Sequence, residues 1–494
     1  MPIFNKMQKG DANVQPAKKK EPRQITKIEA LILLLLSVGI LIANSLVWKL
    51  GTAMGLAIAA LCLILYGILV LGHTWEGFWE SSLTAGRTVL PVFYIILLCG
   101  VVQAAWMMGG TVPMFMYYGL KLLTPSSYLV VTFVVCFWVG VLTGNGWGTM
   151  FTVGLALVNV GNALGVPIIY SVGAIVGGSM NGDRWSPLVD TFNLAAASAK
   201  ADPVEMWRSM LPSSLIGFGI STILFFIIGQ GIEIDAAAGV GDIPQIMSVL
   251  SSNFNFNVFL LLPLLVFIVL QIYKVDTAPT YFISSVVGLL CGCFFQGVSL
   301  SNGLSAFWNG YVANTGDTFI DEMLSQGGFV ANSSLLLVLL VAFLFAGAIN
   351  RLDMLNVLMA DIAKRIHNAG TLVATCTLTC VMAGILSASA YVSVLLNAEI
   401  YKGVFKKMKL APKVLGRTLA EGGGFSTTWV PWGVTGAVIA AILMNGEWTW
   451  GWIPFCFGGW IPPLVHIILT YLNINVPKIE YDENPEQVGI KQPQ

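Results

Sequence analysis

Charged side chains are scarce in this chain of 494 residues, which has 25 Lys and Arg and 25 Asp and Glu, or 10% of all residues. A soluble globular protein carries roughly 25% charged residues, because its surface must be hydrated. Apolar residues make up 56% of this chain, and its mean hydropathy is +0.79. The scarcity of charge excludes a string of water-soluble domains and predicts an all-α polytopic membrane protein.

Residues that carry enzyme or metal chemistry are also few. The three histidines, His73, His367 and His466, share no motif, and the eight cysteines lie in apolar stretches without a histidine companion. Cysteines in such surroundings are typical of buried packing positions. The chain contains no GxxxxGK[ST] phosphate-binding loop, so it has no sign of an ATP-driven pump. We therefore expect no enzyme, no cofactor and no nucleic-acid partner.

Long apolar runs fill the rest of the chain. A bilayer core requires about 20 apolar residues per helix. The clear candidates are 31–48, 52–72, 88–108, 127–143, 147–163, 209–229, 256–272, 280–297, 333–349, 371–387, 389–405 and 450–472. Two further regions, 167–197 and 412–444, are long enough but interrupted, which brings the total to about fourteen crossings. Regions 127–163 and 371–405 are each either two full spans or one re-entrant hairpin.

The distribution of Lys and Arg predicts the orientation. Residues 1–27 hold seven Lys and Arg and the segment 402–413 holds five Lys, whereas 230–255 and 298–332 contain none. Basic residues collect on the cytoplasmic side of membrane proteins. We expect a multi-pass protein of the plasma membrane with both termini in the cytoplasm, and with segments 73–87 and 109–126 as loops on opposite sides.

An internal repeat is visible at an offset of 244 residues. Residues 140–149 resemble 384–393 in small, hydroxyl and aromatic character, and the same offset carries Pro187 onto Pro431. The topology places the two halves in opposite orientation, an arrangement that recurs in secondary transporters. The predicted parts are a disordered basic N-terminus (1–29), two transmembrane helices (30–87), transport repeat 1 (88–230), a linker with two transmembrane helices (231–332), inverted transport repeat 2 (333–473) and a polar tail (474–494).

The first interrupted helix contains the first group of candidate ligands. Broken helices at membrane depth are tolerated where they line a cavity or bind something. The oxygen-bearing side chains at this break are Asp183, Ser186, Asp190, Thr191 and Asn193, with Pro187 as the helix breaker. Oxygen atoms of this kind hold Na⁺, and a buried carboxylate is also able to take a proton. Alternatively, Asp183 only pairs with Arg184 in an interfacial loop.

The second interrupted helix and the two repeated loops supply the remaining candidates. Three glycines follow Glu421 and let the backbone unwind next to neutral oxygens, although a solvated Glu421 in an interfacial turn is an alternative. The candidate ligands here are Glu421, Thr427, Thr428, Asn145, Thr149 and Ser389. The candidate gating and pocket residues are Trp147, Tyr391, Trp432, Pro187 and Pro431, for which close helix packing is the alternative.

These residues carry a family resemblance. Residues 182–195, GDRWSPLVDTFNLA, resemble the signature of NhaC-type sodium/proton antiporters. Residues 109–120, 145–149 and 415–432 resemble three further motifs of that family, in the same order and spacing. The resemblance implies an inverted-repeat carrier with re-entrant hairpins and two discontinuous helices, in a family that includes sodium/proton antiporters and a malate/lactate exchanger.

Several departures from the family pattern leave the cargo open. Val189 and Phe192 stand where the family usually has hydroxyl residues, and Glu421 stands where Asp is usual. The first hypothesis is a Na⁺/H⁺ antiporter with Na⁺ at Asp190 and Asp183. The second is a Na⁺- or H⁺-coupled carrier of a small organic acid or amino acid. An ion channel is a third, disfavoured by the inverted halves. The expected partners are the lipid bilayer, the transported solute and a second copy of the chain.

Overall fold

The computed structural model describes residues 22–48, 50, 52–87, 90–186, 189–232, 243–273, 275–325, 327–330, 333–359, 368–430, 434–444 and 448–479. Within these ranges the elements are helices, and the only β-type pairing is an isolated bridge between Leu410 and Lys478. The all-α class predicted from composition is confirmed.

The described helices of the first half include those on either side of the first interruption and the long helix that follows them. They are α1 Lys27–Ala43, α2 Thr52–Leu69, α3 Trp75–Arg87, α4 Leu90–Met108, α5 Thr111–Leu122, α6 Pro125–Thr143, α7 Gly146–Thr149, α8 Leu155–Ala163, α9 Ile168–Trp185, α10 Asp190–Ala199 and α11 Pro203–Gln230. Two π-helical segments, η1 Asn44–Trp48 and η2 Met150–Gly154, follow α1 and α7.

A middle group precedes the helices of the second half. It comprises α12 Ile243–Asn253, η3 Val258–Leu261, α13 Leu262–Ile272, α14 Thr277–Phe295, α15 Leu300–Asn309 and α16 Thr318–Leu324. The second half comprises α17 Ser333–Arg351, α18 Met354–Met359, α19 Ala369–Ser387, α20 Ala390–Lys407, α21 Pro412–Gly423, η5 Ser426–Trp429, α22 Val434–Leu443, η6 Ile453–Phe455 and α23 Phe457–Tyr471.

Four described helices are individually long and apolar enough to cross a membrane. They are Pro125–Thr143, Pro203–Gln230, Ala278–Phe295 and Ala369–Ser387, and the bent pair Pro244–Asn253 and Val258–Ile272 is a fifth if it counts as one span. The longest, α11, has 28 residues and exposes Ile216, Ile223, Phe226 and Ile227 along its length. Apolar side chains exposed in this way are solvated by lipid rather than by water, as expected for a membrane protein.

Segments in which no span was expected contain helices. Segment 73–87 contains α3, 109–126 contains α5, 230–255 contains α12, and 298–332 contains α15 and α16. In α3, buried small residues at Gly77, Ser82 and Gly86 pack against α17, and Ser81 Oγ donates to Gly347 O at 2.9 Å. Hydropathy alone did not reveal α3, because only its packed face is adapted to a protein neighbour.

The helix bounds in the two halves show the 244-residue offset. α6 begins at 125 and ends at 143, while α19 begins at 369 and ends at 387. α10 spans 190–199 and α22 spans 434–443, again 244 residues apart at both ends. α9 and α21 begin at 168 and 412. The correspondence thus extends well beyond the ten residues visible in the sequence.

The loops after α6 and α19 have matching hydrogen bonds. Gly144 and Ala388 are both left-handed, with φ of 61° and 54°. Thr143 and Ser387 each accept from the backbone N–H two residues later, at 3.3 Å in both loops. Asn145 and Ser389 then cap α7 and α20 by accepting a backbone N–H three residues on. The side chains differ in size, but each supplies the oxygen that its loop needs.

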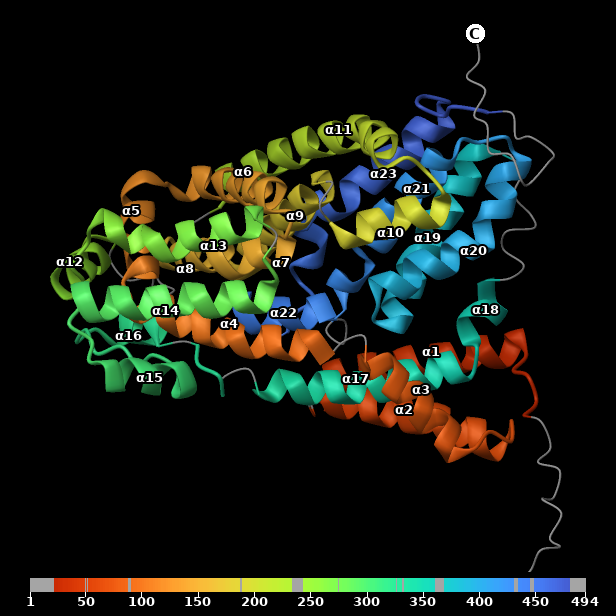
Figure 1. The fold of residues 1–494 in the computed structure, drawn as a ribbon, viewed down its shortest axis with the longest axis horizontal. Coiled ribbons are helices and arrows are strands. Elements are labelled where there is room, and N and C mark those ends of the chain that lie inside the picture. The colour runs from red at the N-terminus through yellow and green to blue at the C-terminus, as the bar shows by residue number, and fades with distance from the viewer. Residues whose placement is uncertain are drawn as a thin grey trace, which may run out of the picture.

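Close contacts between helices hold the centre of the molecule together (Figure 1). α9 packs on α6 through Gly178 and Gly182, whose Cα atoms lie against the backbone of Phe133 and Phe137. α21 packs on α19, α20 and α10. α1, α2, α3 and α17 share a separate hydrophobic cluster along one side of the molecule (Figure 1). The two glycines of α9 therefore allow the close approach of α9 and α6.

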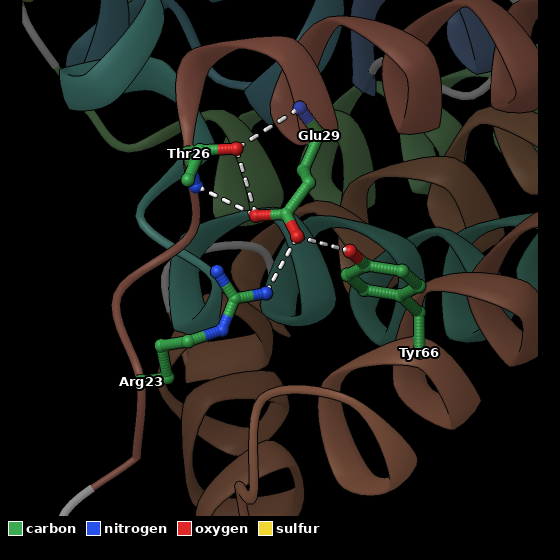
Figure 2. Close-up of polar contacts among 4 residues, drawn as sticks. All are labelled: Arg23, Thr26, Glu29 and Tyr66. Atoms are coloured by element: carbon green, nitrogen blue, oxygen red, sulfur yellow. Dashed lines mark hydrogen bonds and ion pairs between the residues drawn. The ribbon is translucent and has the colours of Figure 1, made fainter.

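The start of α1 is fastened to α2 by a polar cluster (Figure 2). Thr26 and Glu29 form a reciprocal capping box. Glu29 also accepts from Arg23 and from Tyr66 Oη, the latter at 2.8 Å, and its hydrogen bond raises the pKa of the Arg23 guanidinium. The first helix therefore begins at Lys27, before the boundary expected at residue 30, while residues 1–21 and 480–494 lie outside the described residues.

Candidate functional site

A small cavity lies where α9, α10, α11 and α21 approach one another. Its volume is about 20 Å³, and its lining residues are Met180, Asp183, Arg184, Val189, Thr191, Phe192, Met210, Ala420, Gly424 and Phe425. A space of this size is just large enough for one water molecule. In this conformation it therefore suits a single small ion and is too small for an organic acid.

Glu421 lies in the last turns of α21, between cavity-lining residues Ala420 and Gly424. Its side chain is 1% exposed, so the alternative of a solvated interfacial turn is wrong. Oε1 accepts a hydrogen bond from Ser213 Oγ at 2.7 Å, whereas Oε2 is buried without a hydrogen-bond partner among the described residues. A buried carboxylate oxygen that lacks a partner costs free energy unless a cation or proton occupies it.

Arg417 lies one turn before Glu421 and is firmly held. Its Nη1 donates to Ser209 O at 3.2 Å and its Nη2 donates to Asn475 O at 2.7 Å. Asn475 Nδ2 donates to the same Ser209 carbonyl at 2.7 Å. Pro212, which has no N–H, lies in the same stretch of α11 and interrupts the helical hydrogen bonds there. These bonds tie α21 to α11 and to the chain after α23.

Arg184, at the end of α9, reaches across to the second half. Its side chain is buried, and its guanidinium carbon lies 4.5 Å from the centre of the Phe425 ring. Nη2 donates to Gly459 O at 3.5 Å, and Nη1 has no hydrogen-bond partner within the described part of the chain. The charges of Arg184 and Arg417 both act on Glu421, and Asp183 acts on Arg184. The site is thus a network of two carboxylates and two guanidinium groups, of which Glu421, Arg184 and Arg417 are buried and Asp183 is half-buried.

Asp183 connects the cavity to the loop after α6. Its Oδ2 accepts the backbone N–H of Gly146 at 3.1 Å. In that loop, Asn145 Nδ2 donates to Gln271 Oε1 at 3.1 Å, and Thr149 Oγ1 donates to the Asn145 carbonyl at 3.1 Å. Asn145 and Thr149 therefore support the loop that Asp183 binds, and they do not line the cavity.

The other predicted residues of the first break lie in different surroundings. Thr191 lines the cavity and Ser186 is buried. Asn193 is exposed, and its Nδ2 donates to Val189 O in its own helix at 2.9 Å. Asp190 begins α10, but its side chain lies outside the described residues, as do Pro187, Pro431 and Trp432.

The other described candidates of the second half, apart from Glu421, do not line the cavity. Ser389 caps α20, and Thr427 Oγ1 lies 3.2 Å from Thr435 Oγ1, linking η5 to α22. Thr428 is buried. Of the two predicted gates, Trp147 is half-buried and Tyr391 is 45% exposed, and neither lines the cavity.

Two arginines that the sequence pattern does not mark as ligands are central to the network. In the sequence, Arg184 stands out only as a neighbour of Asp183, and Arg417 only as part of a motif. The available signal is their position, since a charged residue inside a membrane segment is costly and almost always has a partner. Across the described ranges, no group of three His, Cys, Asp or Glu residues forms a metal-binding cluster.

The sequence pattern of the Na⁺/H⁺ antiporter family matches residues 178–474, which include α9 from Gly178 onward, α10, α11 and α21. The chain belongs to this family. The resemblance to NhaC-type antiporters seen in the sequence is confirmed, and the family consists of transporters.

Relatives of this antiporter-family chain differ in what their names say they carry. The chain is 29% identical over 449 residues to the Na⁺/H⁺ antiporter NhaC of Alkalihalophilus pseudofirmus, covering 91% of this chain and 96% of the relative. It is 28% identical to the malate-2H⁺/Na⁺-lactate antiporter of Bacillus subtilis, covering 92% and 96%. It is 26% identical to the arginine/ornithine antiporter ArcD of Halobacterium salinarum, covering 84% and 86%.

Proposed function

We propose that this protein is a Na⁺/H⁺ antiporter of the plasma membrane in which the two ions compete for buried carboxylates. The observation that carries the proposal is Glu421, whose Oε2 is buried without a hydrogen-bond partner in the described structure, next to a cavity with room for one small ion. A carboxylate in such a place is stable when it binds a cation or a proton. Because one carboxylate cannot bind both at once, each ion displaces the other, and exchange follows.

Asp183 and Asp190 complete the proposed cation site. Asp183 lines the same cavity and keeps one oxygen engaged with the Gly146 N–H. Asp190 begins α10 directly after the interruption, at the N-terminal end of a helix whose dipole favours negative charge. Both residues belong to the segment that resembles the family signature. We infer that Asp190 and Asp183 share the Na⁺ with Glu421 as their partner from the other half.

Alternating access follows from the proposed inverted repeat. The matching bounds of α6 with α19 and of α10 with α22 support a duplication. If the halves are inverted, exchanging their conformations converts an inward-open carrier into an outward-open one. The site lies between α9 and α10 of the first half and α21 of the second, where such an exchange alters access most directly.

A small organic acid is the second candidate cargo, because Arg184 also lines the cavity. Its Nη1 is buried without a hydrogen-bond partner in the part of the chain described, and a guanidinium group is suited to bind a carboxylate. The malate-lactate antiporter among the relatives points the same way. The cavity of about 20 Å³ argues for the ion, since an organic acid needs a larger space.

Replacing Glu421 by Gln tests the proposal. The amide is nearly isosteric and still accepts from Ser213, so the protein is expected to fold, but it cannot bind Na⁺ or release a proton. Na⁺-driven proton movement in proteoliposomes is expected to fall to the rate of empty liposomes.

Glu205→Gln is the matched control for this experiment. Glu205 is an exposed carboxylate in an ion pair with Lys413, and such surface pairs contribute little. This variant should exchange at the wild-type rate. Wild-type exchange by a folded Glu421→Gln protein would refute the role of this carboxylate.

A further inference from the structure

The two buried arginines near Glu421 are held very differently. Arg417 donates to two backbone carbonyls through its two terminal nitrogens, one at 2.7 Å, and is 1% exposed, although its Nε has no hydrogen-bond partner in the described structure. Arg184 has one long hydrogen bond of 3.5 Å to Gly459 O, a cation–π contact with Phe425, and an Nη1 without a hydrogen-bond partner within the described ranges. A guanidinium group held by so few hydrogen bonds at the wall of a cavity is free to change its position.

Charge sets the direction of that movement, since Glu421 is an unsatisfied acceptor from the second half of the chain. Arg184 lines the cavity together with Ala420, Gly424 and Phe425, which lie within about one helical turn of Glu421 in the sequence. The buried Oε2 of Glu421 lacks a donor and the buried Nη1 of Arg184 lacks an acceptor, within the residues that the structure describes. Each group therefore has what the other needs.

We propose that Arg184 is a tethered counter-cation that neutralises Glu421 when no transported cation is bound and retreats to Phe425 when Na⁺ or H⁺ takes the carboxylate. This inference rests on the proposed antiporter function and adds a residue that determines its cation affinity. The guanidinium group competes with the transported ion for the same oxygen. Arg184 thereby keeps the empty carboxylate from being buried as an isolated charge, at the expense of Na⁺ affinity.

Other ionisable groups around the pair are few. α9 contributes Asp183, α21 contributes Arg417, and α23 contributes His466, which lies 3.0 Å from Thr418 Oγ1. Cys456, just before α23, also acts on Arg184, and α11 contributes the neutral Ser213. The packed neighbours α19 and α20 supply Cys376, Cys380 and Tyr401, and the side chain of Asp190 lies outside the described residues. Within the described part, Arg184 is the loosely held cation of this set.

The test compares Arg184→Gln with wild type in two measurements. Equilibrium binding of radioactive Na⁺ to the purified protein should be about tenfold tighter in the variant, because an opposite charge nearby typically shifts ion binding to a carboxylate by a factor of that order or more. In proteoliposomes the KM for Na⁺ should fall likewise. The pH of half-maximal exchange should move to more alkaline values, because the proton is also bound more tightly.

Two further variants separate charge from packing. Arg184→Lys keeps the positive charge without the planar contact to Phe425, and its Na⁺ affinity should stay within about threefold of wild type. Phe425→Leu removes the aromatic ring that the Arg184 guanidinium group contacts, and it should therefore weaken Na⁺ binding. Lys413→Gln, which removes a partly exposed positive charge from the same helix as Glu421, should leave Na⁺ binding and exchange unchanged.

Each outcome bears on a different claim. Unchanged or weaker Na⁺ binding by Arg184→Gln, beside a wild type that binds Na⁺, would overturn this inference alone. If Arg184→Gln does not fold, unchanged or tighter binding by Phe425→Leu would overturn it. A wild type that neither binds Na⁺ nor moves protons in response to it would overturn the proposed function, and this inference with it.

Discussion

Glu421 shows how much support one membrane carboxylate needs. Ser213 donates to one oxygen, and the charges of Arg417 and Arg184 act on the group from two helices. A buried charge without such compensation costs several kcal/mol. The compensation is incomplete at Oε2, and this incomplete pairing is what leaves the residue able to bind a transported ion.

At the residue level, we predict that Asp190 and Asp183, the two aspartates at the first interrupted helix, differ in their importance for transport. Asp190→Asn should leave the protein folded, because the amide is neutral and nearly isosteric, yet abolish exchange. Asp183→Asn should raise the Na⁺ requirement by roughly threefold to tenfold, since it removes one nearby charge while the Gly146 N–H still finds an acceptor. Initial rates of Na⁺-driven proton movement against Na⁺ concentration measure both. Wild-type transport by Asp190→Asn, together with lost transport in Asp183→Asn, would reverse the assignment.

The sequence predicted Asp183, Thr191 and Ser186 as parts of a buried site, because a polar run at an interrupted helix is costly in a membrane unless it lines a cavity or binds a ligand. It could not predict the burial of Glu421, which depends on α11 packing over α21. Nor could it predict that Arg184 faces the second half rather than its neighbour Asp183, because that contact spans 241 positions to Phe425. Asn193 is exposed rather than turned inward, since periodicity after a break does not show which face turns outward.

Among the elements, α6 and α19 end in the same way although their last residues differ. Gly144 adopts φ of 61° at no steric cost, whereas Ala388 adopts φ of 54° against a penalty for its Cβ. The sequence revealed this loop pair through its small residues. It did not reveal α3 and α5, because helices of 13 and 12 residues lack the apolar length of a span.

Substituting the residues at the two left-handed caps, Gly144 and Ala388, should change the free energy of unfolding in opposite directions. We predict that Ala388→Gly stabilises the protein by about 1 kcal/mol and that Gly144→Ala destabilises it by about 1–2 kcal/mol. The midpoint of unfolding by sodium dodecyl sulfate, measured on purified protein, tests both. Gly219→Ala is the control: nothing lies within 4 Å of its added Cβ, so a helical alanine should be neutral or slightly stabilising. Equal effects of the same sign at 144 and 388 would rule out the proposed role of the left-handed caps.

For the whole molecule, the charge pattern and the packing agree on one face. Glu205 at the start of α11 and Lys413 at the start of α21 form an ion pair at 3.1 Å, so the start of α11 lies beside the Lys-rich segment 402–413 that is predicted to be cytoplasmic. The orientation of that face relative to the membrane remains a prediction from the distribution of Lys and Arg. The halves of the transport repeat are inverted only if this orientation holds.

Labelling of single cysteines in a cysteine-free background tests the orientation. A membrane-impermeant maleimide added to intact cells should label a cysteine that replaces Asn314, which is exposed in the segment after α15. It should not label cysteines that replace Glu205 or Lys407. Position 240 should also react, although it lies outside the described residues. After cells are broken open, Glu205 and Lys407 should react as well, which controls for accessibility. Labelling of Lys407 in intact cells would refute the inverted topology.

The central claim is that Na⁺ alone drives proton movement through this protein. The most direct measurement follows the internal pH of proteoliposomes that contain the wild-type protein when Na⁺ is added outside, first without and then with malate or another small organic acid. We predict that the interior becomes alkaline on addition of Na⁺ alone, because each entering Na⁺ displaces protons from the shared carboxylates. An interior pH that is unaffected by Na⁺ and changes only when the organic acid is present would contradict it.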